Sequence, residues 1–459
     1  MQQLSVLILA AGQGKRMVSD LPKVLHRLGG RPLLAHVLTA AHQLENTATR
    51  VVVYGHGGEA VRAAFADEPS VLWAEQAEQL GTGHAVAQAL PLLDEAGITL
   101  VLYGDVPLIQ PETLQPLVDA ARQGRLALLT AKLDNPAGYG RIVRDDQGQV
   151  QRIVEEKDAT PAERCLSEIN TGILAVSTTK LRRWVAELRN DNAQGEYYLT
   201  DTIALAVREG VPVEPFTVTE PLEVQGVNDR RQLAELERYY QRWQAEKLMR
   251  EGATLLDPAR VDVRGALVTG RDVVIDVNVV FEGTVRLGDR VKIGPFCVLK
   301  DAIIGDDVEI FSHCWIDGAE VGPGSQIGPF ARLRPETRLA AGVHIGNFVE
   351  TKKTCINPGS KVNHLTYLGD AEIGSGVNVG AGTITCNYDG ANKHKTIIED
   401  DAFIGSNSSL VAPVRIGRSA TIGAGSSVSR DVPDDSLCLT RAPRKEVTNW
   451  QRPVKSKKL

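Results

Sequence analysis

The sequence predicts an α/β domain with a largely parallel sheet, followed by a long helix and a parallel β-helix of hexapeptide repeats. Apolar strand-like runs alternate with amphipathic helical stretches over the first half of the chain. In the second half an aliphatic residue returns at every sixth position, a period that neither a helix nor an ordinary strand has. With 459 residues the chain is long enough to bury two cores. We therefore divide it into residues 1–228, a linker helix at 229–252, a β-helix at 253–438 and a tail at 439–459.

The α/β domain contains six strand candidates, and the loop after the first of them is rich in glycine and positive charge. The candidates lie at residues 5–10, 50–54, 71–74, 98–103, 127–132 and 172–176. Ligands bind beyond the carboxyl ends of the strands in sheets of this kind. Gly12 and Gly14 let backbone amides approach an anion there. Three cations accompany them, Lys15, Arg16 and Lys23. The simpler alternative is a solvated basic loop.

Two further loops carry polar residues at strand ends. Gln76 follows the third strand candidate, and the segment 79–84 opens a helix. Asp105 comes directly after a buried apolar strand, which makes it a candidate site residue. An isolated aspartate in this place can also do no more than cap the next turn.

The segment 229–250 contains neither glycine nor proline and is rich in helix-forming residues. Asp229 is placed to cap the helix at its start, and Gly252 is placed to end it. We expect this helix to connect the α/β domain with the repeats.

The repeats predict short strands that stack in parallel coils. A small or β-branched residue follows each aliphatic residue after four positions, as Cys297 follows Ile293. Both are expected to point into the column, with three six-residue units in each coil. Glycine often follows the aliphatic residue, and we expect it to supply the backbone angles of the corners without a Cβ clash. These glycines include Gly294, Gly305, Gly346 and Gly417.

Departures from the repeat are the candidate site of the second half. Arg334 and Lys352 place positive charge on neighbouring coils. His364 lies two positions after the inward-pointing Val362, where a histidine is more often an ordinary surface residue. Residues 385–401 interrupt the period and must project from the column. Projecting loops are where repeat proteins place binding residues.

Several motifs in both halves match known enzymes. Residues 9–17 with the following Pro22 and Lys23 resemble the signature of sugar-phosphate nucleotidyltransferases, and segment 79–84 resembles the part with which uridyltransferases bind uracil and ribose. Residues 361–370 and 380–390 resemble hexapeptide acyltransferases that acetylate an amino sugar phosphate. Over essentially its whole length the chain resembles the bifunctional N-acetylglucosamine-1-phosphate uridyltransferase/glucosamine-1-phosphate acetyltransferases. The resemblance implies a Rossmann-like nucleotidyltransferase domain, a left-handed parallel β-helix and a homotrimer whose acetyl site is shared between subunits.

The resemblance also implies the reactions. Glucosamine-1-phosphate would be acetylated by acetyl-CoA, and UMP would then pass from UTP to N-acetylglucosamine-1-phosphate with Mg²⁺ as cofactor. His364 is the candidate general base, because an ordinary histidine pKa of ~6.5 suits that task at neutral pH. Arg16 and Lys23 would neutralise charge during uridylyl transfer, and a contact from Ser406 would help the oxyanion of acetyl transfer.

Residue by residue, the resemblance carries four sets of contacts over to this chain. UTP and UDP-N-acetylglucosamine would be bound by Leu9, Gly12, Lys23, Gln76, Gly81, Thr82, Tyr103, Gly140, Glu155, Asn170 and Asn228. The metal ligands would be Asp105 and Asn228. The amino-sugar phosphate would contact Arg334, Lys352, Tyr367, Asn378, Asn387 and Tyr388. Acetyl-CoA would contact Ala381, Asn387, Tyr388, Ser406, Ala424 and Arg441. The family has histidine where this chain has Glu156, which adds negative charge beside Glu155.

The composition of the chain limits which partners and which cellular compartment are expected. The 51 basic and 57 acidic residues give a net charge of −6, which argues against nucleic acid or an acidic membrane as principal partner. The six cysteines form no Cys-x-x-Cys pair, which indicates free thiols in a reducing cytoplasm. No apolar run reaches the ~18 residues of a membrane span, and no signal sequence is evident. The end of the tail, 452–459, is basic and expected to be disordered.

Two other functions fit parts of the pattern. One is a nucleotide-sugar pyrophosphorylase whose β-helix only oligomerises, and the other is a non-enzymatic scaffold with the same two domains. His364 and Asn387 argue against the first. The complete set of residues in the glycine-containing loop argues against the second.

Overall fold

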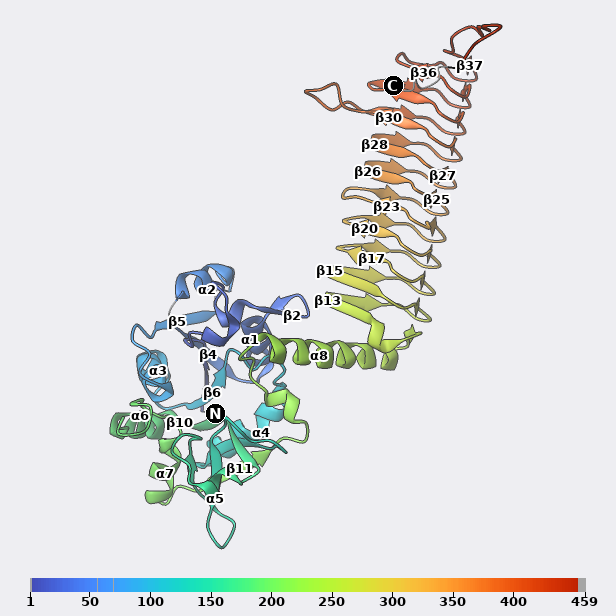
Figure 1. Cartoon of the computed structure of the whole chain (residues 1–459). Helices are drawn as coiled ribbons and strands as arrows, with labels where there is room; N and C mark the ends of the chain where they lie inside the picture. Colours follow the sequence, from blue (N-terminus) through green and yellow to red (C-terminus); the bar gives the residue numbers. More distant parts are fainter. Residues whose placement is uncertain (1, 56, 69, 453–459) are drawn as a thin grey trace, which may run out of the picture. The chain divides into compact units, whose positions relative to one another are not determined.

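The computed structural model describes residues 2–55, 57–68 and 70–452, which belong to two compact units (Figure 1). The first unit is Met1–Trp243 and the second is Gln244–Leu459. No helix in the described part of the chain is long and apolar enough to span a membrane.

The first unit contains a largely parallel sheet with helices on both faces, as the sequence predicts. Its main strand order is β11-β7-β10-β6-β1-β4-β5. At its centre β1 (Leu4–Leu9) pairs in parallel with β4 (Thr47–Tyr54) and β6 (Ile98–Tyr103). The flanking strands are β5 (Val71–Glu75), β7 (Leu126–Lys132), β10 (Glu168–Ser177) and β11 (Val213–Thr217).

Alternate residues of β1 enter two different cores. Val6 and Ile8 pack in the core that includes α1 (Leu33–Gln43) and α4 (Pro111–Arg122). Leu7 lies in the core on the other face, which includes α3 (Thr82–Ala89), α6 (Thr178–Glu187) and α7 (Asp201–Arg208). A central strand that is covered on both faces has no polar side, which is why it reads as a continuous apolar run.

All six strand candidates are confirmed within a few residues, but three strands of this sheet were not predicted from the sequence. These are β11 and the hairpin of β8 (Arg141–Arg144) and β9 (Val150–Val154). The hairpin strands are short and carry arginines, so their apolar alternation is weak. In addition, β10 runs antiparallel to both β6 and β7. This reversal brings the β8–β9 hairpin to the same sheet, where β8 pairs with β10.

The second unit is a parallel β-helix, seen in Figure 1 as a column of stacked coils from yellow to red. Strands of one coil pair in parallel with those of the next, as β22 (Gln326–Ile327) does with β25 (His344–Asn347). The aliphatic residues and the small residues that follow them are buried in one continuous core. Ile293 is 3% exposed and Cys297 is completely buried. The six-residue period therefore predicted the inward positions correctly.

The prediction for the corner glycines is wrong about their backbone angles and correct about the Cβ clash. Gly294, Gly305, Gly346 and Gly417 do not adopt positive φ, so unusual backbone angles are not the reason for them. The predicted clash is real, because a Cβ on Gly346 would lie 1.9 Å from the carbonyl oxygen of Asn363 in the next coil. Close stacking of coils is what requires glycine at these positions. The left-handed conformation is instead taken by other corner residues.

The projecting segment is shorter than predicted. β30 (Ile384–Cys386) and β31 (Thr396–Ile398) keep the repeat and pair with neighbouring coils. Only the residues between them, 387–395, leave the column, and this loop stands out beside β30 in Figure 1.

Helix α8 (Arg230–Arg250) begins and ends as the sequence indicates. Oδ1 of Asp229 accepts a hydrogen bond from the amide of Gln232 at 2.8 Å. Gly252 follows the helix with a φ of 104°. The tail from 453 to 459, for which disorder is expected, lies outside the described residues.

Candidate active sites

A pocket of about 500 Å³ lies at the carboxyl ends of β1 and β6 in the first unit. It brings together eight of the residues that the sequence singled out in three separate loops. They are Leu9, Gly12, Lys23, Gln76, Gly81, Thr82, Tyr103 and Asp105. The site therefore forms where the rule for parallel sheets places it. Arg16 is exposed on the short helix η1 (Lys15–Met17) and is outside this lining set.

One of the acidic residues that line the pocket, Asp105, is paired with a lysine. Lys23 Nζ contacts the carboxylate of Asp105, and both side chains are mostly buried. The amide of Val227 donates to the carbonyl oxygen of Asp105 at 2.9 Å, which brings the backbone of Asn228 beside this acid. The Lys23 contact shows that the carboxylate is aimed at a place where a cation fits.

These groups suit a magnesium ion that is shared with a substrate. Among the described residues no group of three or more His, Cys, Asp or Glu could hold a metal. Mg²⁺ often has only one or two protein ligands, with water and substrate phosphates completing its coordination. One carboxylate at Asp105 and one amide at Asn228 match that pattern.

One wall of the pocket is held by hydrogen bonds between segments that are distant in sequence. Gln79 Nε2 donates to the carbonyl oxygen of Ala11 at 2.8 Å. Thr82 Oγ1 accepts from the amide of Leu199 at 3.1 Å. Gly81 has a φ of 108°, and a Cβ there would lie 2.6 Å from the carbonyl oxygen of Tyr197. The wall is therefore fixed before any ligand binds.

A second group of predicted residues meets near β10. The amide of Asn170 donates to the carbonyl oxygen of Gly140 at 2.8 Å. A Cβ on Gly140 would lie 3.4 Å from the Glu155 carboxylate, which accepts a hydrogen bond from Thr200 at 3.0 Å. Burial, followed by nearby acidic groups such as Asp201, raises the pKa of Glu155. The structure thus brings Gly140, Glu155 and Asn170 together.

At one corner of the β-helix, four residues of other coils occupy positions equivalent to that of His364. The amide after His364 donates to the carbonyl oxygen of Asn347, and each later coil repeats this bond. The repeated bonds are Gly382 N to His364 O at 3.3 Å, Asn407 N to Ala381 O at 2.8 Å and Gly425 N to Ser406 O at 2.8 Å. We call the equivalent residues the corner column: Asn347, His364, Ala381, Ser406 and Ala424. Beyond it, the Arg441 side chain is 3.7 Å from the Cβ position of Gly425.

His364 makes a specific side-chain contact within the corner column. Its Nδ1 lies 3.0 Å from Oδ1 of Asn347, one coil away. A ring nitrogen that faces an amide oxygen carries the proton. Nε2 of His364 is then the nitrogen that can accept a proton from a substrate.

The residue that follows each corner position in the sequence differs in type from coil to coil along the β-helix. It is occupied by Phe330, Phe348 and Leu365 up to the coil of His364, and by Gly382 and Asn407 after it. All five have positive φ. The bulky apolar side chains of the earlier coils are thus replaced by glycine and asparagine beside Ala381 and Ser406, and a Cβ on Gly382 would lie 2.3 Å from Oδ1 of Asn407.

Positive charge gathers near the projecting loop. The ammonium group of Lys393 lowers the pKa of Lys352, and burial and Arg334 act in the same direction. Arg334 also bonds to Glu350 at 2.8 Å. Two neighbouring ammonium groups are a suitable receptor for a phosphate, because an anion relieves their repulsion.

The remaining predicted residues of this half lie in different places. The Tyr367 hydroxyl and the Asn387 amide both pack over Gly369. Asn387 is buried and its Nδ2 donates to Asp370. Tyr388 is 60% exposed on the projecting loop, and its hydroxyl bonds to the carbonyl oxygen of Gly390. Asn378 lies on β29 (Asn378–Val379), in the sheet that also carries His364.

Models of known families match different parts of the chain. Residues 6–253 match the model of the MobA-like NTP transferase domain. Residues 263–368 match that of the GMPPB C-terminal domain, and residues 395–430 match that of the hexapeptide repeat of succinyl-transferase.

Full-length relatives give the family. A protein of Methylococcus capsulatus named bifunctional protein GlmU is 60% identical over 457 residues, which cover 99% of each chain. Proteins of the same name from Marinobacter nauticus and Ralstonia nicotianae are each 58% identical, over 99% of this chain and 100% of their own length. The chain belongs to the bifunctional GlmU family. Both units are covered by each of these GlmU relatives, so the family assignment holds for the whole chain.

Sequence reasoning missed three residues near the candidate sites of this GlmU family member. Asn347 could have been found from the coil length, because it lies one coil before His364. Lys393 was noted only as part of the interruption of the repeat. Tyr139 precedes Gly140, and its pKa is raised by burial and then by the charge of Asp105.

Proposed function

We propose that the pocket of the first unit performs uridylyl transfer and that the corner column of the second performs acetyl transfer. The chain is a bifunctional transferase. It acetylates glucosamine-1-phosphate with acetyl-CoA and transfers UMP from UTP to N-acetylglucosamine-1-phosphate, which gives UDP-N-acetylglucosamine and pyrophosphate. The observation that carries this assignment is the presence of two separate constellations, one in each unit, in a chain whose full-length relatives are named as bifunctional.

In acetyl transfer the sugar amine attacks the thioester carbonyl, a C–N bond forms and the C–S bond breaks. Nε2 of His364 accepts the proton that the amine loses, and the CoA thiolate leaves. Lys352 and Lys393 bind the sugar phosphate, together with Arg334. Acetyl-CoA lies along Ala381, Ser406 and Ala424 with Arg441 at its phosphate end, where side chains beside the column are small. Ser406 helps to stabilise the oxyanion.

In uridylyl transfer an oxygen of the sugar phosphate attacks the α-phosphorus of UTP and pyrophosphate leaves. No covalent enzyme group takes part, so the residues of the pocket act by positioning and by neutralising charge. Gly12 offers a backbone that phosphates can approach, while Lys23 and Arg16 contribute positive charge. Glu155, Asn170 and Gly140 bind the sugar. Asp105 and Asn228 would hold Mg²⁺, which supplies charge neutralisation on the phosphate oxygens when bound.

A homotrimer is supported by an apolar ladder at the corner of the β-helix. The rings of Phe296, His313, Phe330 and Phe348 stack with centroids 5.0, 4.7 and 5.4 Å apart. Phe330 is 47% and Phe348 56% exposed, and both adopt positive φ, which is strained for a bulky residue. We propose that other copies of the chain cover this ladder. Light scattering should then give a mass of three chains.

A cytoplasmic location is part of the same proposal. All six cysteines have free thiols, which fits a reducing compartment. The substrates are also those of cellular metabolism, as UTP and acetyl-CoA are made inside cells.

The function is tested by incubation with glucosamine-1-phosphate, acetyl-CoA, UTP and Mg²⁺, with each omitted in turn. Without UTP, free thiol should still be released and N-acetylglucosamine-1-phosphate should accumulate. Without acetyl-CoA, UDP-N-acetylglucosamine should form only when N-acetylglucosamine-1-phosphate is added. A full mixture that releases pyrophosphate but no thiol would contradict the assignment of acetyl transfer.

Replacing Asn347 should alter acetyl transfer through His364. Asn347→Ala removes one hydrogen bond to a ring that becomes charged, so kcat should fall about tenfold with little change in KM. Asn347→Asp places a carboxylate beside the ring and favours the protonated imidazole. The acid limb of kcat against pH should then move up by about one unit. Uridylyl transfer serves as the control, and an unchanged pH profile in Asn347→Asp would contradict this role.

A further inference from the structure

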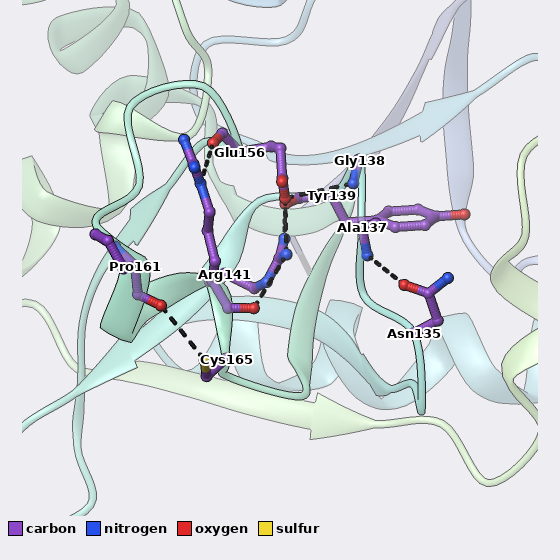
Figure 2. Close-up of polar contacts among 9 residues, drawn as sticks. Asn135, Ala137, Gly138, Tyr139, Arg141, Glu156, Pro161 and Cys165 are labelled. Carbon is purple, nitrogen blue, oxygen red and sulfur yellow. Dashed lines mark hydrogen bonds and ion pairs between the residues drawn. The ribbon is translucent and has the colours of Figure 1, made fainter.

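A buried arginine lies beneath the loop that carries Gly140. Arg141 is 1% exposed in β8, between β9 and β10. Its guanidinium group bonds to Glu156 at 2.7 Å and donates to the carbonyl oxygen of Tyr139 and, at 3.4 Å, to that of Arg164. Figure 2 shows the Glu156 carboxylate joined by hydrogen bonds to Arg141 on one side and to Gly138 on the other.

Glu156 is bound on more than one side. Its Oε2 also accepts from the amide of Gly138 at 3.4 Å, and its carbonyl oxygen accepts from Arg164 Nε at 3.3 Å. Its hydrogen bond with Arg141 lowers the pKa of Glu156, so this carboxylate is ionised at neutral pH. A buried guanidinium without a counter-charge is costly. Glu156 therefore gives the loop both a counter-charge and an anchor.

The two neighbouring acids face different partners. Glu155 bonds to Thr200 and lies against Gly140. Glu156 bonds to Arg141 and to the amide of Gly138 on the outer side of the same loop. The ring of Tyr139 points away from this cluster in Figure 2. One short loop thus connects the Arg141–Glu156 pair with the sugar side of the pocket.

We propose that Glu156, acting through Arg141, is a positioning residue that holds the 137–140 loop in the geometry that binds the sugar phosphate of the uridylyl reaction. Gly140 and Tyr139 are the parts of the loop that the pair aligns. UTP binds on the other wall, so its affinity is independent of the pair. This inference rests on the proposed uridylyl transfer and on the place of Gly140 in the sugar pocket.

The test measures KM for N-acetylglucosamine-1-phosphate and for UTP separately in Glu156→Gln and Glu156→Ala. Glu156→Gln keeps an acceptor for Arg141 but loses the charge, so KM for the sugar phosphate should rise about tenfold, and Glu156→Ala should raise it further. KM for UTP should change less than about twofold, and acetyl transfer should stay as in the unmodified chain.

Glu168→Gln is the matched control. Glu168 bonds to Arg144, the other arginine of β8, at 2.7 and 2.8 Å, so the same chemical change is made to the partner of a second arginine on that strand. This variant should leave both KM values unchanged. If Glu156→Gln and Glu156→Ala leave the sugar-phosphate KM unchanged, or raise both KM values equally, the positioning role is wrong. If the unmodified chain forms no UDP-N-acetylglucosamine, the proposed function itself fails.

Discussion

His364→Ala should reduce kcat of acetyl transfer by about 10²- to 10³-fold, the usual contribution of a general base. The substrate amine must lose a proton as it attacks, and Nε2 of His364, the ring nitrogen that does not face Asn347, is the group placed to accept it. KM for glucosamine-1-phosphate should change little, because the proposed contacts to its phosphate come from Lys352, Lys393 and Arg334 and not from His364. Thiol release from acetyl-CoA measures the effect.

Two controls accompany this variant. Uridylyl transfer should be unchanged, because its pocket is built from the other unit. His344→Ala removes the same side chain from β25, which pairs with the strand of His364, and should retain acetyl transfer. If His364→Ala retains acetylation, the assignment of the general base is wrong.

Asp105→Asn should abolish most uridylyl transfer, with a fall in kcat of at least about 10²-fold. The change removes the one acidic group of the pocket that faces Lys23 and the backbone next to Asn228. Without this charge the site no longer has the carboxylate expected to hold Mg²⁺, and Lys23 loses its partner. Pyrophosphate release measures the effect.

Asp119→Asn is the control for this prediction. Asp119 is half-exposed on α4, where it pairs with Arg122, and it lies outside the set that lines the pocket. It should retain pyrophosphate release, and both variants should retain thiol release. Pyrophosphate release should also be measured over a range of Mg²⁺ concentrations. If the concentration that gives half-maximal activity is the same in Asp105→Asn and in the unmodified chain, Asp105 is not a metal ligand.

The period of six predicted the β-helix because it depends on local chemistry alone. Each coil buries the same positions, so Ile293 and Cys297 could be placed in the core from their spacing. The reason for Gly346 could not be found in the same way. Its Cβ is excluded by Asn363 of the next coil, and that contact depends on how closely coils stack.

In the α/β unit, too, local patterns could be read from the sequence but contacts between distant segments could not. The apolar run of β1 identified a central strand, and the strand rule located the pocket that contains Gly12 and Asp105. The antiparallel direction of β10 could not be predicted from the sequence, because strand direction is set by chain connections over long distances. The pairing of Arg141 with Glu156 depends on that topology, and the charge of Glu156 alone gave no indication of its partner.

The two-part fold and the family resemblance could be predicted from the sequence, and nearly all candidate site residues were proposed from it, because periodicity and motifs are properties of neighbouring residues. The handedness of the β-helix came from the resemblance and not from the period. Three contacts could be seen only in the folded chain: Asn347 faces His364, the charge of Lys393 acts on Lys352, and the buried Arg141 has Glu156 as its counter-charge. These contacts join residues 15 to 41 positions apart, and only the stacking of coils and the pairing of strands bring them within bonding distance.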